Sequence, residues 1–159
     1  MVSGVMSEGI LIIASVVIAT SIAGVVISQL GVFESTFTAT TEGQKDMILT
    51  KIKIVYATNT TDDNVNVWVK NIGINPILSA NNTDVYFGEI DSVTRIPLNT
   101  KKQLDDTWFY DGPLPYPDWQ IGETHSINIT DDDIVRGVTY VVSVSTPNGV
   151  SDEYIFSLP

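Results

Sequence analysis

The chain opens with a long run of apolar and small residues that contains no charge. No charged residue lies between Glu8 and Glu34, and residues 9–30 read GILIIASVVIATSIAGVVISQL. The run lacks the polar stripe of a soluble core helix and is longer than the apolar part of a secretory signal, about 7–15 residues. Because about 20 apolar residues cross a bilayer core, the pattern predicts a single transmembrane helix over residues 1–33.

Beyond this helix the spacing of the apolar residues changes. Residues 34–48 are polar and rich in threonine, so they predict either a stalk or a continuation of the helix. From residue 49 onward apolar and polar residues alternate, and clusters of Asn, Asp, Gly and Pro separate the alternating runs. The predicted strands are 51–56, 64–69, Asp84–Gly88, Asp91–Pro97, Thr107–Tyr110, His125–Thr130, Val138–Thr146 and Glu153–Leu158.

This order of elements predicts a mainly β protein, in which the N-terminal helix precedes an antiparallel immunoglobulin-like β-sandwich over residues 49–159. The sandwich has to form without a disulfide because the chain contains no cysteine. Alternate residues of each strand should face a common core. The candidates for the core are Ile52, Ile54, Val67, Val69, Val85, Phe87, Ile127, Ile129, Tyr140, Val142, Val144, Ile155 and Leu158.

Charge excludes one class of partner. With 19 acidic and 8 basic residues the formal net charge is −11, so nucleic acid and anionic lipid surfaces would be repelled. Hydrophobic residues make up 43% of the chain and charged residues only 17%, an excess that is concentrated in the N-terminal helix. An acidic domain that is exposed to solvent and held by an apolar helix fits both observations.

Catalytic and metal-binding patterns are weak. The only histidine is His125, beside Glu123, and neither a Ser-His-Asp arrangement nor a Gly-rich phosphate loop accompanies it. The run Asp131–Asp133 could offer oxygen ligands to Ca²⁺, but it lacks the loop spacing of a calcium site and equally fits a solvated turn. We therefore expect no catalytic residue, cofactor, metal or small-molecule substrate, and no enzymatic activity.

Small residues recur every four positions along two neighbouring lines of the helix. Such lines let helices approach closely, although a run built from Ile, Val, Ala and Ser also produces them by chance. Homo-oligomerisation through them is a hypothesis. The residues are Ser15, Ala19 and Ala23 on one line and Thr20, Gly24 and Ser28 on the other.

A segment rich in aromatic residues and proline lies between the predicted strands at 107–110 and 125–130. Its rings could close one end of the sandwich, or they could form a loop that binds a partner protein. The residues concerned are Trp108, Tyr110, Tyr116 and Trp119.

The orientation of the helix is not set by charge, because no Lys or Arg precedes it and the first basic residue after it is Lys45. Three N-x-S/T sequons follow the helix, at Asn59, Asn81 and Asn128. As N-glycosylation takes place outside the cytoplasm, these candidate sites favour an extracytoplasmic β-domain.

Two short segments resemble proteins of the archaellum, the rotary motility apparatus of archaea. Ser7-Glu8 leads directly into Ile10–Ser15, and Val67–Ile77 reads VWVKNIGINPI, both similar to the archaellum stator family FlaG and its relative FlaF. The resemblance implies a single-pass protein of the archaeal cytoplasmic membrane with its β-domain in the pseudoperiplasm. It also implies that the β-domain binds a FlaF-like partner and the S-layer.

The main alternative is a minor archaellin or pilin-like subunit, whose apolar helix would pack in the core of an extracellular filament. Archaellins are made with a basic leader that is cleaved after a glycine, whereas only Met1, Val2 and Ser3 precede Gly4. That difference favours the membrane anchor. A membrane-tethered hydrolase or binding protein is the third hypothesis, and the lack of paired catalytic motifs disfavours it.

Overall fold

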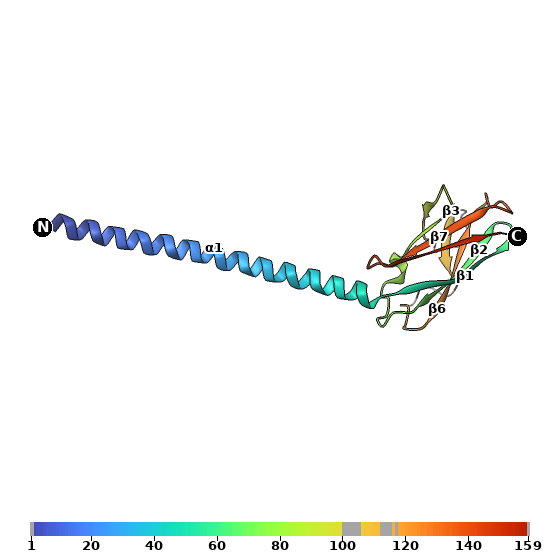
Figure 1. Ribbon diagram of the computed structural model, residues 1–159, viewed down its shortest axis with the longest axis horizontal. Coiled ribbons are helices and arrows are strands. Elements are labelled where there is room, and N and C mark those ends of the chain that lie inside the picture. The colour runs from blue at the N-terminus through green and yellow to red at the C-terminus, as the bar shows by residue number, and fades with distance from the viewer. Residues whose placement is uncertain (1, 100–105, 112–115, 117, 159) are drawn as a thin grey trace. The chain divides into compact units, whose positions relative to one another are not determined.

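The computed structural model describes the backbone of residues 2–99, 106–111, 116 and 118–158. Contacts divide the chain into two compact units, Met1–Gly43 and Gln44–Pro159, which are described separately. One helix is followed by eight strands and a 3-10 turn (Figure 1). The elements are α1 (Val2–Leu49), β1 (Ile52–Thr61), β2 (Asn64–Asn71), η1 (Ala80–Asn82), β3 (Asp84–Glu89), β4 (Thr94–Ile96), β5 (Thr107–Tyr110), β6 (Thr124–Thr130), β7 (Thr139–Ser145) and β8 (Ser151–Ser157).

Helix α1 continues through the whole polar segment at residues 34–48, so this segment extends the helix and does not form a separate stalk. The segment contains no proline, and the hydroxyl groups of Ser35, Thr36 and Thr40 bond back to the helix, as when Thr36 donates to the carbonyl of Val32 at 2.9 Å. The part Met6–Leu49 is long and apolar enough to cross a membrane by length and composition. The last helical hydrogen bond runs from the Thr50 amide to the Asp46 carbonyl at 3.0 Å.

The strands form two four-stranded antiparallel sheets, which confirms the predicted sandwich. The first sheet has the order β1-β2-β6-β5 and the second has the order β4-β3-β7-β8. The two sheets meet along one side where the Ile54 amide donates to the Asp152 carboxylate at 2.7 Å. On the other side the Asn99 amide donates to the Trp108 carbonyl at 2.8 Å, which links the segment after β4 to β5.

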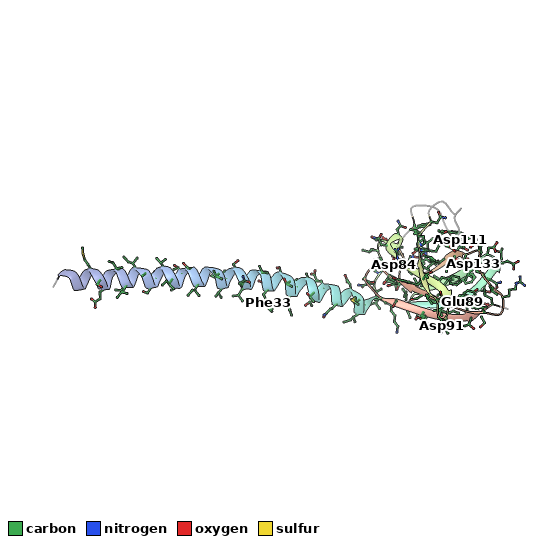
Figure 2. The ribbon with its side chains drawn as sticks, turned by 90° about the horizontal axis from the view of Figure 1, so that it is seen from above. Phe33, Asp84, Glu89, Asp91, Asp111 and Asp133 are labelled. Atoms are coloured by element: carbon green, nitrogen blue, oxygen red, sulfur yellow. The ribbon has the colours of Figure 1, made fainter. Side chains whose placement is uncertain are left out.

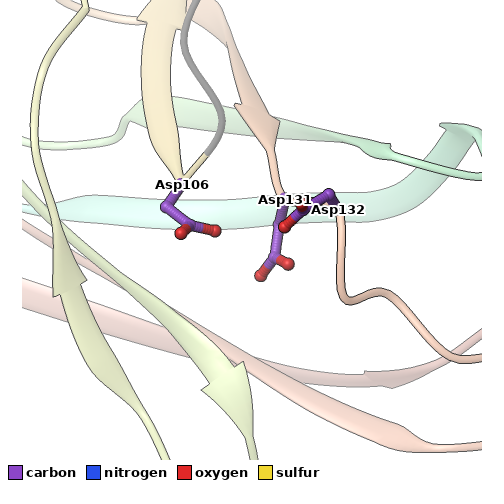
Figure 3. Close-up of side chains that lie close together, drawn as sticks. All are labelled: Asp106, Asp131 and Asp132. Atoms are coloured by element: carbon purple, nitrogen blue, oxygen red, sulfur yellow. The ribbon is translucent and has the colours of Figure 1, made fainter.

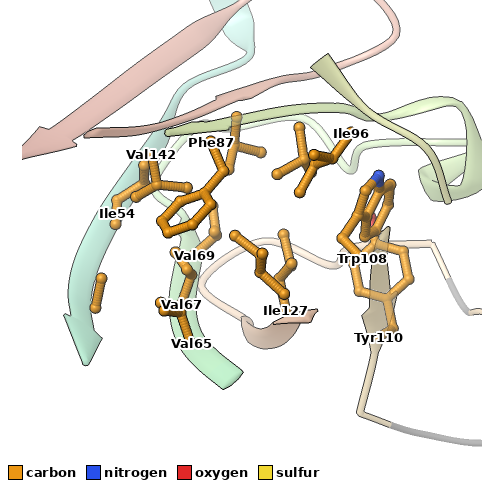
Figure 4. Close-up of a cluster of buried hydrophobic side chains, with 14 of the residues drawn as sticks. Ile54, Val65, Val67, Val69, Phe87, Ile96, Trp108, Tyr110, Ile127 and Val142 are labelled. Atoms are coloured by element: carbon orange, nitrogen blue, oxygen red, sulfur yellow. The ribbon is translucent and has the colours of Figure 1, made fainter. Parts of the chain in front are cut away.

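The core between the sheets is built from alternate residues of every long strand (Figure 4). Phe87 from β3 and Tyr140 from β7 stack at 5.3 Å, and Val67 and Val142 from opposite sheets are fully buried. Twelve of the thirteen side chains predicted to face inward are buried. The exception is Ile155.

Ile155 is 53% exposed, so its prediction as a core residue is wrong. It pairs with Val141 on the outer face of β8, while Tyr154 and Phe156 pack against the core. Leu158 is buried, and it lies three residues after Ile155, so the two residues cannot share a face of a strand. The side chains of β8 that face the core are therefore those in phase with Tyr154 and Phe156.

The predicted strand at 91–97 is shorter in the structure, where only Thr94–Ile96 is extended. The residues before it form a turn in which the Ser92 amide donates to the Glu89 carbonyl at 2.8 Å. Gly88 has a φ of +154°, and a Cβ there would lie 2.3 Å from the Ser92 carbonyl oxygen. The close approach of the turn to β3 therefore requires glycine at this position.

Two substitutions in the second sheet should distinguish the core from the outer face. Phe87→Ala removes a buried ring and should lower the free energy of unfolding by about 3–5 kcal/mol. Ile155→Ala removes an exposed side chain and should change it by less than about 1 kcal/mol. Urea unfolding of the full chain in detergent, followed by circular dichroism of the β-domain, measures both. A larger effect for Ile155→Ala would contradict the observed register of β8.

Candidate interaction surfaces

Helix α1 has no apolar partner among the described residues of its own chain. Its large side chains are exposed, from Ile10 at 68% to Phe33 at 69%, and they point outward on all sides of the helix (Figure 2). Several hydroxyl groups within it are satisfied locally, since Thr20 donates to the Val16 carbonyl at 2.9 Å and Ser15 to that of Ile12 at 2.8 Å. The helix is therefore suited to a lipid bilayer or to the apolar core of an assembly.

The two predicted lines of small residues lie within this exposed helix. The backbone around Gly24 is open, because a Cβ there would meet nothing within 4 Å. Space of that kind is what a second helix would need, but a helix in lipid has it as well. The packing role of Ser15, Ala19, Ala23, Thr20, Gly24 and Ser28 stays a prediction.

The last turn of α1 is bound to the loops at one end of the sandwich. Asn148 donates to the Asp46 carbonyl at 3.3 Å and to the Thr50 hydroxyl at 2.6 Å. The Ile74 amide donates to the Leu49 carbonyl at 2.9 Å. Sequence reasoning did not find this junction, because its residues lie in three segments that are far apart along the chain.

Asn71 orders the loop that forms the junction. Its amide nitrogen donates to the Asn75 and Trp119 carbonyls at 2.9 and 3.2 Å, and its amide oxygen accepts from the Gly73 nitrogen at 3.0 Å. The side chain is completely buried. The Asn-x-Gly part of the segment that resembles FlaG is thus the turn that meets the end of the helix.

Gly73→Ala should loosen this junction. A Cβ at Gly73 would lie 2.6 Å from both the Leu49 carbonyl oxygen and the Lys51 nitrogen, and neither backbone atom can move away without breaking the junction. We expect a loss of about 1–3 kcal/mol of stability, the usual cost of overpacking, together with faster hydrogen exchange of the Ile74 amide. Gly43→Ala is the control, since a Cβ there meets nothing within 4 Å. Unchanged exchange at Ile74 in Gly73→Ala would contradict the role assigned to the turn.

The four aromatic residues that were candidates for a partner loop are buried. Trp108, Tyr110, Tyr116 and Trp119 are 1%, 4%, 7% and 0% exposed and belong to the core cluster. Tyr110 lies at the centre, with edge-to-face contacts to the other three at 4.7 to 5.8 Å. This arrangement closes one end of the sandwich, which was the alternative interpretation. Residues 112–115 and 117 of the segment lie outside the described residues.

Two side chains of this aromatic cluster have close polar neighbours, whereas the Tyr116 hydroxyl and Trp119 Nε1 are buried without a hydrogen-bond partner among the described residues. The Tyr110 hydroxyl donates to the Ala80 carbonyl at 2.9 Å, and burial raises the pKa of this phenol far above its usual range. His125 stacks on Trp119 at 5.2 Å, and its Nε2 lies 3.1 Å from a carboxylate oxygen of Glu123. The Gln120 amide and then His125 hold the pKa of Glu123 below its ordinary value. The side chain of His125 is therefore held in the folded domain by stacking on Trp119 and by its proximity to Glu123.

Carboxylates gather at the opposite end of the sandwich. Oxygens of Asp106, Asp131 and Asp132 lie within 4.8 Å of one another (Figure 3). Asp131 also accepts a hydrogen bond from the Asp133 amide at 2.9 Å. This bond closes a short turn, which fits the interpretation of the run as a solvated turn. Burial, and then the neighbouring carboxylates, raise the pKa of Asp131 above its ordinary value of 3.8. Calcium binding at Asp131–Asp133 stays an open question, because exposed acidic groups are common without an ion.

Asp131→Asn should stabilise the domain at neutral pH. Because folding raises the pKa of this carboxyl, its charged form destabilises the folded state above that pKa, and the penalty disappears as the pH falls below 3.8. We expect the variant to unfold about 1–3 °C higher at pH 7 and at the same temperature as the parent near pH 3. Glu153→Gln is the control, since it removes one exposed charge from β8. An equal shift in both variants would show that only net charge matters.

The three sequons differ in accessibility. Asn81 is exposed in η1, whereas Asn59 in β1 and Asn128 in β6 are half-buried. Asn128 is paired on both sides, with Asn66 of β2 and Phe109 of β5.

The structure describes an exposed apolar helix followed by an antiparallel β-sandwich. The chain belongs to the archaeal-type flagellin family, whose sequence model matches residues 2–156. No curated protein matches the chain.

Solved structures of archaellum proteins are similar to it. The archaellum periplasmic stator protein FlaG from Sulfolobus acidocaldarius is 28% identical, with a TM-score of 0.60 over 68% of this chain and 100% of that one. The archaellum periplasmic stator complex of FlaF and FlaG from the same organism is 28% identical, with a TM-score of 0.59 over 68% of this chain and 90% of that one. The archaeal flagellum of Methanospirillum hungatei strain JF1 is 13% identical, with a TM-score of 0.70 over 96% of this chain and 92% of that one. The resemblance to the FlaF and FlaG family is thereby confirmed.

Proposed function

We propose that this chain is a non-enzymatic structural component of the archaellum that acts as a stator. Helix α1 anchors it in the cytoplasmic membrane by a single pass, and the sandwich lies in the pseudoperiplasm. There it binds a FlaF-like partner and, with it, the S-layer. The observation that carries the proposal is the similarity of the sandwich to FlaG at 28% identity over the full length of that solved chain.

The apolar surface of α1 between Glu8 and Glu34 supports the anchor. About 20 residues cross the hydrocarbon core, and the charge-free stretch between Glu8 and Glu34 provides that length. Charged residues at both ends of the stretch would lie in the interfacial layers, where they remain hydrated. The hydroxyl groups of Ser15, Thr20 and Ser21 between them bond to backbone carbonyls of the helix.

The junction supports a role under load. A static component has to transmit force between its anchor and its extracytoplasmic domain. The end of α1 is joined to the sandwich by the bonds of Asn148 and by the Ile74 amide as well as by the chain itself. Several hydrogen bonds formed together resist local opening better than a single peptide linker does.

The second candidate is a filament subunit. The similarity to the Methanospirillum filament extends over 96% of this chain, helix included, with a TM-score of 0.70. At 13% identity it concerns the fold alone. In this alternative the exposed apolar side chains of α1 would pack against copies of the same helix in an extracellular filament.

Of the three sequons, we propose Asn81 as the one that carries a glycan if the folded domain is modified. It is exposed in a 3-10 turn, while Asn128 lies within a central strand and Asn59 within β1. A glycosyltransferase must surround the asparagine side chain, and paired strands prevent this.

A double substitution on the helix distinguishes the anchor from the filament. Ala19→Ile with Gly24→Ile fills both lines of small residues but keeps the segment apolar. A bilayer accepts the bulkier helix, so the variant should remain in the membrane fraction and the cells should remain motile. Cell fractionation, immunoblotting of sheared filaments and a motility assay measure the outcome.

Ile18→Leu with Ile22→Leu is the matched control, because it conserves the volume and polarity of exposed positions on the same helix. If the parent protein is present in sheared filaments and the double isoleucine variant is lost from them, the filament alternative holds. Failure of the full chain to bind a FlaF-like protein or isolated S-layer in a pull-down would end the stator proposal.

A further inference from the structure

The turn between β7 and β8 contains Asn148-Gly149, which is the only Asn-Gly pair in the sequence. Asparagine is one of the thermolabile residues, because the backbone nitrogen that follows it can attack its side-chain amide. Glycine allows this attack most readily, since it has no Cβ to hinder the approach of its nitrogen. Every other asparagine of the chain is followed by a residue with a side chain. The sequence therefore singles out Asn148 as the amide most open to this chemistry.

The structure gives water access to the pair. Gly149 is exposed and has a φ of +84°, a backbone conformation that favours glycine. Asn148 is half-buried, and a cavity of about 340 Å³ opens beside it, with Asp46, Thr50 and Pro147 among its lining residues. Both the reacting nitrogen and the amide thus lie next to solvent.

The same amide joins the last turn of α1 to the 146–150 turn. Its nitrogen donates to the Thr50 hydroxyl at 2.6 Å and to the Asp46 carbonyl at 3.3 Å. The Asp46 carbonyl also accepts the last hydrogen bond of the helix, from the Thr50 amide at 3.0 Å. The bond to Asp46 requires an N–H donor, which an ionised carboxylate does not have.

We propose that Asn148 is a deamidation site and that its conversion to aspartate or isoaspartate releases the end of α1 from the 146–150 turn. The Gly149 nitrogen forms a bond to Asn148 Cγ, the Cγ–Nδ2 bond breaks, and Nδ2 leaves as ammonia with the proton of the Gly149 amide. Water then opens the resulting succinimide, at Cγ to give aspartate or at the backbone carbonyl carbon to give isoaspartate. The inference does not rest on the stator role, because it concerns only segments within residues 44–159.

The product cannot restore the original contacts. The Thr50 hydroxyl can turn to donate to the new carboxylate, but the Asp46 carbonyl is an acceptor and would face another acceptor. The end of a helix also carries partial negative charge, which disfavours a carboxylate at this place. Isoaspartate further lengthens the main chain by one carbon. Since the released ammonia is lost to solvent, the change is irreversible.

The closed turn slows the reaction. The Gly149 amide donates to the Thr146 carbonyl at 2.9 Å, and the Thr146 hydroxyl donates to Asn148 Oδ1 at 2.6 Å. These bonds hold the attacking nitrogen and the attacked amide in place, so ring closure requires the turn to open first. The rate of deamidation at Asn148 should therefore follow the opening of the contacts between the two segments.

Peptide mapping tests the site directly. The full chain is purified in detergent, kept in mildly alkaline buffer below its unfolding temperature, and digested with trypsin at intervals under mildly acidic conditions. Residues 137–159 follow Arg136 and contain no Lys or Arg, and Asn148 is the only amide side chain among them. A mass change from amide to acid in this peptide is therefore assigned without ambiguity. We expect Asn148 to deamidate faster than any other asparagine and to give isoaspartate as well as aspartate.

The protective effect of the closed turn is tested from the helix side. Thr50→Val removes the hydroxyl that accepts from Asn148 but nearly conserves the volume of the side chain. It should accelerate deamidation of Asn148 by about threefold or more, because the turn opens more often. Thr36→Val is the matched control, since it removes a hydroxyl that bonds within the exposed part of α1.

The consequence for the structure is measured by hydrogen exchange. Asn148→Asp reproduces one of the two products and should speed exchange of the Thr50 and Ile74 amides by about fivefold or more. The aged parent chain should show the same change in its deamidated fraction, so the test remains available if a variant fails to fold. Asn82→Asp is the control, because it adds the same charge at an exposed position of η1.

Three results would overturn the proposal. Asn148 that keeps its amide while other asparagines lose theirs is not the deamidation site. Exchange of the Thr50 and Ile74 amides at the parent's rate, in both Asn148→Asp and the aged chain, would show that the end of α1 is not released. An equal deamidation rate in Thr50→Val and the parent would show that the contacts with the helix do not control the reaction.

Discussion

The apolar surface of helix α1 is the constraint on which the rest of this protein depends. Burying one Ile, Leu or Val side chain is worth about 1.5–3 kcal/mol, and residues 9–33 consist largely of such side chains exposed on every side of the helix. Nothing in the described part of the chain covers them. A lipid bilayer or neighbouring helices are the environments that such a surface suits.

The sandwich is stabilised independently of that helix. Its core consists of residues from Ile52 to Leu158, and both sheets contribute to it. Within residues 44–159, the last turn of α1 is bound to the loops of the sandwich by polar contacts of Asn148, Asn75 and the Ile74 amide.

Charge is distributed unevenly over the sandwich. Carboxylates collect in loops, as at Asp106 and Asp131, and on strands β3 and β8 of the second sheet, while the strands of the first sheet have none. A net charge of −11 keeps such a domain soluble and separates it from anionic surfaces. The strands that carry Tyr56 and Trp68 therefore have basic but no acidic side chains.

The sequence by itself determined the helix, the number and kind of the strands and nearly all of the core. The reason is that uniform apolarity and alternation are local patterns, and a residue such as Val67 needs only its neighbours in sequence to predict its burial. Ile155 failed because the phase of a short edge strand depends on pairing with β7. Only the tertiary structure brought Asp46 to Asn148, Asp106 to Asp131 and Tyr56 beside Trp68 and Ser126, since each of these groups joins segments whose proximity is set by sheet order and register.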